Sequence, residues 1–141
     1  MSYREVSGSK PLVIAAFSGR VFGLDPATGR PVWGRESDAG SVVRMAVDGE
    51  LLFTLIGGVL ECLERATGKL HWELNTAGET LVADDGVLYV AARSRVWAIS
   101  YSGEQLWDAM LQGMDSEPVA IAAGNQVAQV DLTRAALWRS T

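Results

Sequence analysis

Tryptophan recurs along this chain at a near-constant interval, and no other feature constrains the fold as strongly. Four of the five tryptophans are spaced by 39, 35 and 31 residues; they are Trp33, Trp72, Trp107 and Trp138. Residues 21–33 align with residues 60–72 without a gap, and both segments contain Ala-Thr-Gly four to six positions before the tryptophan. Three repeats keep a glycine four positions before the tryptophan: Gly29, Gly68 and Gly103. A repeat of this length indicates units that bury their apolar surface against one another.

Each repeat has the pattern of short β-strands separated by turns. In the second repeat, apolar stretches at residues 41–47, 50–56, 59–63 and 69–74 are separated by Asp48-Gly49, Gly57-Gly58 and Ala66-Thr67-Gly68. Asp-Gly and Gly-Gly pairs adopt positive φ at low cost and close tight hairpins. Asp85-Gly86 is expected to play in the third repeat the part of Asp48-Gly49 in the second. The repeat therefore predicts a four-stranded antiparallel meander.

The same reading divides residues 1–141 into four units of one domain, at about 1–38, 39–76, 77–112 and 113–141. In the first unit we expect strands at residues 3–6 and 12–17 on either side of a Ser-Gly-Ser turn. The last unit has room for three strands only, at residues 118–123, 126–131 and 135–139. Four-stranded units of this size stack radially, so the fold class we predict is an all-β propeller with a shortened last blade.

Residues 24–33, Leu-Asp-Pro-Ala-Thr-Gly-Arg-Pro-Val-Trp, resemble the tryptophan-docking repeat of PQQ-like β-propellers. That family includes the quinoprotein alcohol dehydrogenases and the propeller lipoprotein of outer-membrane assembly. The second repeat departs from the pattern with Glu64 in place of Asp25, the third has Ser100-Tyr-Ser-Gly, and the fourth loses the turn. The resemblance implies rings of about eight blades.

The repeated glycines and tryptophans are expected to be structural: Gly29, Trp33, Gly68, Trp72, Gly103 and Trp107. A glycine closes the turn and leaves open surface, and an indole fills the gap between blades while its N–H finds a backbone acceptor.

A row of only four blades would expose an apolar blade face at each end, and such patches drive association. We expect two chains to pair about a twofold axis and complete an eight-bladed ring, because this is the commonest closed assembly. The alternatives are four blades that close on themselves, another oligomer, or a piece of a longer protein. In the pair, the fourth blade would meet the partner's first blade near Tyr3, Arg4, Pro118 and Trp138.

Residues typical of catalysis are scarce in this sequence. The resembling dehydrogenases imply a quinone, a calcium ion held by carboxylates and often an adjacent Cys pair, whereas Cys62 is the one cysteine here. Asp84 and Asp85 precede Gly86 and are read as turn chemistry, and the one histidine, His71, as a partly exposed residue of a strand. We expect no enzyme activity, no cofactor and no metal.

The charge is −5, with 17 acidic and 12 basic residues, and the basic residues are scattered. This balance disfavours nucleic acid and anionic lipid as partners. The apolar runs are too short for a membrane span and the first residues lack a signal-peptide core, so a cytoplasmic location without membrane contact is expected.

Binding then becomes the expected role. The innermost strands of the blades should line a central channel with Arg4, Arg44, Glu79 and Glu117. These side chains would form either an ion-pair network between blades or a site for an anionic small molecule or peptide. The function we predict is a non-catalytic scaffold that forms a homodimer and binds an unknown protein partner. The alternatives are an anionic ligand in the channel, or a relative of a PQQ-dependent dehydrogenase.

Overall fold

The chain folds into consecutive antiparallel sheets. The computed structural model describes residues 10–111 and 117–128, and strands are the only regular elements in these two ranges. The first sheet has three strands, β1 (Val13–Phe17), β2 (Arg20–Leu24) and β3 (Pro31–Glu36). The second has four, β4 (Val43–Asp48), β5 (Leu51–Ile56), β6 (Val59–Glu64) and β7 (Leu70–Asn75). The third also has four, β8 (Thr80–Asp84), β9 (Val87–Ala92), β10 (Arg95–Ser100) and β11 (Gln105–Met110). The fourth pairs β12 (Ile121–Ala123) with β13 (Gln126–Ala128).

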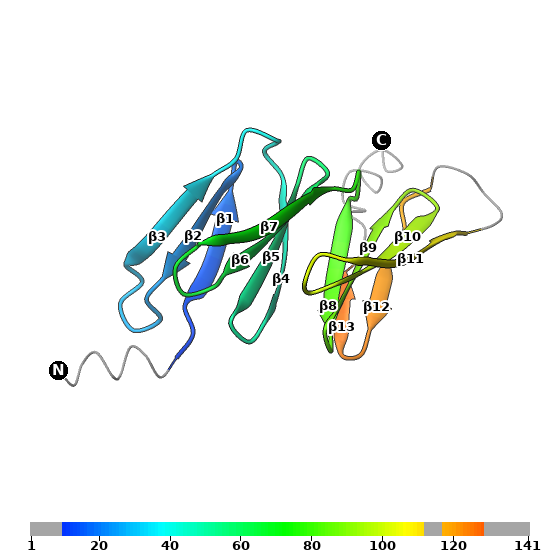
Figure 1. Cartoon of the computed structure of the whole chain (residues 1–141). Helices are drawn as coiled ribbons and strands as arrows, with labels where there is room; N and C mark the ends of the chain where they lie inside the picture. The colour runs from blue at the N-terminus through cyan, green and yellow to red at the C-terminus, as the bar shows by residue number, and fades with distance from the viewer. Residues whose placement is uncertain (1–9, 112–116, 129–141) are drawn as a thin grey trace, which may run out of the picture.

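The first three sheets stand side by side, from β1–β3 through β4–β7 to β8–β11 (Figure 1), and β12–β13 lies against β8 of the third sheet. Within each sheet, every strand pairs antiparallel with the next strand in sequence, which is the meander expected of a propeller blade. The predicted all-β propeller of repeated blades is therefore confirmed. The described part of the chain contains no helix suited to crossing a membrane.

Several strand predictions need adjustment at the two ends of the chain. The strand predicted at residues 118–123 is shorter, since β12 covers Ile121–Ala123. The strands predicted at residues 3–6 and 135–139, and the end of the one predicted at 126–131, lie outside the described residues.

The tight turns follow the glycine pairs, with one shift of register. Gly57 and Gly58 have φ of 58° and 82°, and Asp85 and Gly86 have φ of 48° and 87°, so both pairs close two-residue hairpins. The equivalence between Asp48-Gly49 and Asp85-Gly86 is wrong by one residue. Asp48 is the last residue of β4 and pairs with Leu51, as Asp84 pairs with Val87. Asp48 therefore corresponds to Asp84.

The hydrophobic core lies between the sheets. Between the first and second sheets it is a cluster of buried Val21, Leu52, Ile56 and Leu63. Between the second and third sheets it is larger and includes Phe53, Leu55, Leu60, Cys62, Leu81, Leu88, Val90, Trp97 and Ile99. The second sheet thus contributes its two faces to two different cores, so it cannot bury its apolar residues without both neighbours.

Two tryptophans join each sheet to the next through the same contact. Trp33 Nε1 donates to the Arg65 carbonyl at 2.9 Å, and Trp72 Nε1 donates to the Tyr101 carbonyl at 2.8 Å. A Cβ on Gly68 would lie 2.6 Å from the Trp33 ring, and one on Gly103 would lie 3.1 Å from the Trp72 ring. Each indole is therefore pressed against the glycine turn of the following blade.

Replacing Gly68 with alanine tests this contact. We expect Gly68→Ala to lower the free energy of unfolding by about 3 kcal/mol, because it adds a clash with Trp33 to the strain of a left-handed residue. Gly86→Ala is the control, since Gly86 also has a positive φ but its Cβ would meet no atom within 4 Å. The control should lose about 1 kcal/mol. Equal losses in urea unfolding would contradict the contact.

Candidate functional site

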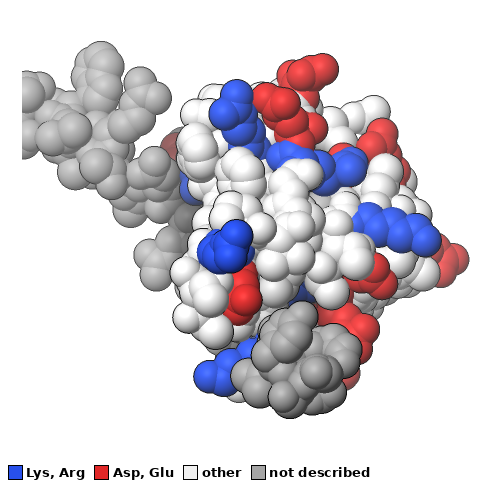
Figure 2. Space-filling model, turned by 90° about the vertical axis from the view of Figure 1, so that its left-hand side faces the viewer, with Lys and Arg blue, Asp and Glu red and all other residues white. Residues whose placement is uncertain are grey.

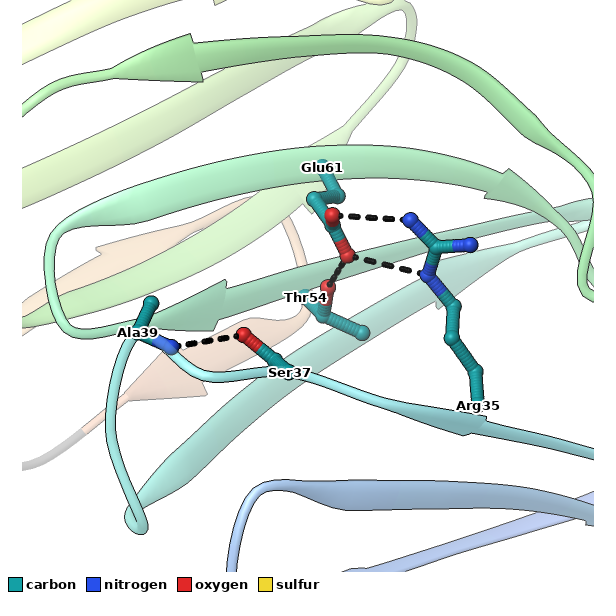
Figure 3. A network of polar contacts seen from close by, with 5 residues as sticks. All are labelled: Arg35, Ser37, Ala39, Thr54 and Glu61. Atoms are coloured by element: carbon teal, nitrogen blue, oxygen red, sulfur yellow. Dashed lines mark hydrogen bonds and ion pairs between the residues drawn. The ribbon is translucent and has the colours of Figure 1, made fainter.

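An ion pair crosses the junction between the first and second sheets (Figure 3). Arg35 on β3 donates from Nη2 and Nε to the two carboxylate oxygens of Glu61 on β6, at 3.0 and 3.3 Å. The Thr54 hydroxyl on β5 also donates to Glu61, at 3.4 Å. The Glu61 side chain is only 12% exposed, so the Arg35 charge compensates a carboxylate that is largely removed from water. This bidentate contact gives the first junction a specific polar pairing.

The second junction has apolar residues at the equivalent positions. Leu74 is the equivalent of Arg35, because each lies two residues after the tryptophan of its repeat. Trp97 is the equivalent of Glu61, because each lies one residue before the strand partner of the tryptophan in its own sheet. Leu74 and Trp97 both belong to the core between the second and third sheets. A cavity of about 400 Å³ opens beside them, and the Arg95 guanidinium lies 4.9 Å over the Trp97 ring. The two junctions are thus built from different chemistry at the same register.

The first sheet has one face with no sheet packed against it among the described residues. Strand pairing aligns Val13, Phe17 and Leu24 with Leu52, Ile56 and Leu63 of the second sheet. In the second sheet these positions are buried, with Leu52 and Leu63 at 0% and Ile56 at 2% exposure. In the first sheet Val13 is 50% exposed and Phe17 is 58% exposed. The first sheet therefore has the apolar residues of a blade junction, but they are in contact with solvent.

We call this surface the open face; it consists of Val13, Ala15, Phe17, Arg20, Phe22, Val32, Gly34 and Glu36. Phe17 and Phe22 stack on it with ring centroids 5.8 Å apart, and an exposed ion pair joins Arg20 to Glu36 at 3.1 Å. Phe22 occupies the position of Glu61 and Trp97, the residues that receive the side chain of a preceding blade. Figure 2 views this end of the molecule and shows uncharged surface in the middle with Lys, Arg, Asp and Glu around it. The open face is the candidate interaction site.

The predicted channel residues are placed as follows. Arg44 is exposed on β4, and Glu79 is exposed just before β8 and pairs with Arg93 at 3.6 Å. The carbonyl of the exposed Glu117 accepts from the Ser94 N–H at 3.0 Å, so Glu79 and Glu117 both contact the β9–β10 hairpin. Arg4 lies outside the described residues. A site for an anion in the channel stays a prediction.

The sequence analysis did not identify Arg93 as the partner of Glu79, although the predicted hairpin indicates that they lie close together. A hairpin centred on Asp85-Gly86 brings the residues before β8 opposite those after β9. Of the predicted seam residues, Pro118 is exposed and precedes β12, whereas Tyr3 and Trp138 lie outside the described residues.

The chemically reactive residues lie as expected for a structural role. Cys62 is buried between the second and third sheets, and burial raises the pKa of its thiol to about 11. His71 is exposed on β7, and Asp85 takes the left-handed conformation of its hairpin. In residues 10–111 and 117–128, no group of three or more His, Cys, Asp and Glu side chains is placed to hold a metal ion.

The tyrosine of the third-repeat turn also has a structural role. Tyr101 donates its hydroxyl to the Asp48 carboxylate at 2.5 Å, and burial followed by this hydrogen bond raises the pKa of its phenol. The contact links the second and third sheets.

Substitutions should show that the ion pair at the first junction contributes more to stability than an exposed ion pair does. We expect Arg35→Leu to lower the free energy of unfolding by about 2 kcal/mol, because Glu61 is left without its cation. The double variant Arg35→Leu/Glu61→Leu should recover most of that loss, since it reproduces an apolar junction. Arg20→Leu breaks an exposed pair and should change stability by no more than about 0.5 kcal/mol. Equal losses in the free energy of unfolding for Arg35→Leu and Arg20→Leu would contradict a larger contribution from the Arg35–Glu61 pair.

The Cys62 thiol should be inert in the folded protein. Its raised pKa keeps the thiol protonated at pH 8, and its burial blocks access, so a disulfide reagent should label it only as the protein unfolds. Labelling at pH 8, followed by absorbance with and without urea, checks this. Rapid labelling of the native protein would contradict the buried position.

Comparison with known proteins agrees with this architecture. Residues 17–137 match the model of the family described as outer membrane protein assembly factor BamB. No curated protein matches the sequence. BamB from Moraxella catarrhalis has a similar structure, with a TM-score of 0.61 and 21% identity over 75% of this chain and 35% of that chain.

Two other structures share the fold. Quinohemoprotein alcohol dehydrogenase from Comamonas testosteroni has a TM-score of 0.60 and 20% identity over 71% of this chain and 19% of that chain. The computationally designed Ika8 protein has a TM-score of 0.63 and 18% identity over 85% of this chain and 40% of that chain. This chain therefore spans 19% to 40% of the length of these three proteins.

The repeat, the blade meander and the match over most of the sequence agree, and the chain belongs to the PQQ-like β-propeller family that includes BamB.

Proposed function

We propose that this protein is a non-catalytic scaffold for protein–protein interaction, and that it reaches its working form by pairing with a second copy into a closed ring. The open face carries this proposal. Its residues Val13 and Phe17 are half exposed, although the equivalent Leu52 and Ile56 are buried by the preceding blade. An apolar face of a blade in water favours association with another apolar blade face.

Pairing about a twofold axis would cover both ends of the row at once. The first sheet packs on the second, whereas β12–β13 lies against the third (Figure 1), so the first sheet of one copy could meet the last sheet of its partner. Because the twofold axis repeats the contact, one kind of junction closes the whole ring.

The scaffold role is supported by the family. Its model is described as an assembly factor, and the chain spans 35% of the BamB structure that it resembles. Propeller rings offer broad rims and a channel for protein partners, and fold alone does not supply an active site.

The residues that the sequence offered for a quinone and calcium site have structural positions. Cys62 is buried in the core between two blades, and Asp84 and Asp85 end a strand and form its turn. These positions support a role without catalysis.

The mass in solution tests the assembly. Light scattering coupled to gel filtration should give twice the 15.1 kDa of one chain. Phe17→Glu places a charge on the open face and should shift the protein to the mass of one chain, because burying an unpaired carboxylate is costly. A wild-type mass of 15.1 kDa at every concentration would overturn the ring.

Leu70→Glu is the matched control, because Leu70 is also an exposed apolar residue but lies on the outermost strand of the second sheet. It should leave the mass unchanged. For the non-catalytic part, adding PQQ with calcium should leave no bound chromophore after gel filtration. A retained chromophore would instead favour a relative of the dehydrogenases.

A further inference from the structure

The cavity of about 400 Å³ between the second and third sheets is large enough for a small molecule, and we call it the inter-blade cavity. One wall is the end of β7, with Leu74. The other wall comes from β10 and the start of β11, with Arg95, Trp97, Ile99 and Gln105. Sites for small molecules typically have volumes of about 300–1,000 Å³. Both walls belong to the same chain, so the cavity does not depend on the ring proposed above.

The cavity lies at the register where the first junction has its ion pair. There Arg35 reaches across from β3 to Glu61 on β6. At the second junction the equivalent residues are Leu74 and Trp97, and both line the cavity. A leucine side chain is shorter than an arginine side chain, so Leu74 does not extend across the junction as Arg35 does. The exchange of an ion pair for these two residues explains why space is left here.

The cavity also contains hydrogen-bond donors without a net charge. Arg95 Nη2 donates to the Asp108 carboxylate at 2.9 Å, which compensates the charge of the guanidinium. Arg95 Nε is buried and has no hydrogen-bond partner among the described residues. A guanidinium has five N–H donors, so the bond to Asp108 leaves most of them available. The other side chains that line the cavity are uncharged.

Exposed apolar residues lie on the same side of the third sheet. Leu106 and Met110 on β11 are 47% and 68% exposed. Alternation along the strand places them on the face of Asp108, the residue that bonds to Arg95. In the second repeat, the residue one position before the tryptophan is polar His71, whereas in the third it is Leu106. The surface beside the cavity is therefore apolar where the corresponding surface of the second sheet is polar.

We propose that the inter-blade cavity binds a small uncharged molecule that has an apolar ring and a carbonyl oxygen. The ring packs against Leu74, Trp97 and Ile99, because these side chains form the apolar part of the lining. The oxygen accepts a hydrogen bond from the Arg95 guanidinium, whose N–H groups are otherwise incompletely used. An uncharged ligand fits because Asp108 already balances Arg95, and a carboxylate would have to compete with Asp108 for the same cation.

Three probes of nearly the same shape test the chemistry of the ligand. Benzamide has the ring and an uncharged carbonyl, benzoate has a negative charge, and toluene lacks the oxygen. We expect benzamide to bind with a dissociation constant on the order of 1 mM, measured from the shift of the Trp97 indole N–H signal in nuclear magnetic resonance spectra. Benzoate and toluene should bind at least about fivefold more weakly.

Two pairs of variants test the position of the site. Leu74→Trp fills the cavity and should raise the dissociation constant of benzamide at least about tenfold. Leu70→Trp is its control, because Leu70 is on the same strand but does not line the cavity, and it should stay within about twofold of wild type. Melting curves show whether both variants fold.

Arg95→Met removes the donors and should weaken benzamide binding about tenfold. Arg20→Met is its control, because each arginine lies three residues before the strand partner of the tryptophan in its own sheet and each forms an ion pair. It should leave binding unchanged.

Each contrary result overturns a stated part of the proposal. If none of the three probes shifts the Trp97 signal up to its solubility limit, the inter-blade cavity is not a site for this class of molecule. If Leu74→Trp and Leu70→Trp bind benzamide equally, the binding is elsewhere. Tighter binding of benzoate would show that the site selects an anion, and equal binding of toluene would show that Arg95 contributes no hydrogen bond. None of these results depends on whether the protein forms a ring.

Discussion

The contact on which this fold depends is an indole pressed against a glycine turn in the next sheet. It combines a hydrogen bond from Trp33 or Trp72 to a backbone carbonyl with close packing on a residue that has no side chain. The glycine serves two purposes, since it takes the left-handed conformation and leaves room for the ring. The contact fixes the position of each blade on its neighbour, and the apolar cores between the sheets follow from that position.

A blade joined in this way buries its apolar residues only where a neighbouring blade packs against it. A residue of given register is buried in the second and third sheets, and its counterpart in the first sheet is exposed: Leu52 and Leu88 at 0%, and Val13 at 50%. Neighbour contacts of this kind make the terminal units of a repeat protein the places where association is decided. The open face therefore connects the physics of the fold to the function proposed for the protein.

The junctions also differ in a way that sets the order of blades. Arg35 and Glu61 form an ion pair at the first junction, whereas apolar Leu74 and Trp97 lie at the equivalent positions of the second. Exchanging the partners would leave Glu61 facing Leu74 without a cation, which is costly for a carboxylate in a low-dielectric setting. Phe22 at the same position of the open face favours an apolar partner. The chemistry of the junctions thus distinguishes blades whose backbones are nearly alike.

The repeat of tryptophan and glycine, the turn pairs and the alternation of apolar residues were enough to predict the blades, because these are local signals with a fixed period. The one-residue shift at Asp48 escaped, since Asp-Gly can close a turn in two registers that differ only in which strand pairs form. An exposed apolar face at the end of the row was expected from the sequence, but the residues that form it were not identified. The Arg35–Glu61 pair escaped, because it joins residues 26 apart on two different blades. The sequence by itself determined which residues alternate and where the chain turns. Only the tertiary structure decided which of those residues are covered, because burial depends on the neighbouring blade and not on the residue's own strand.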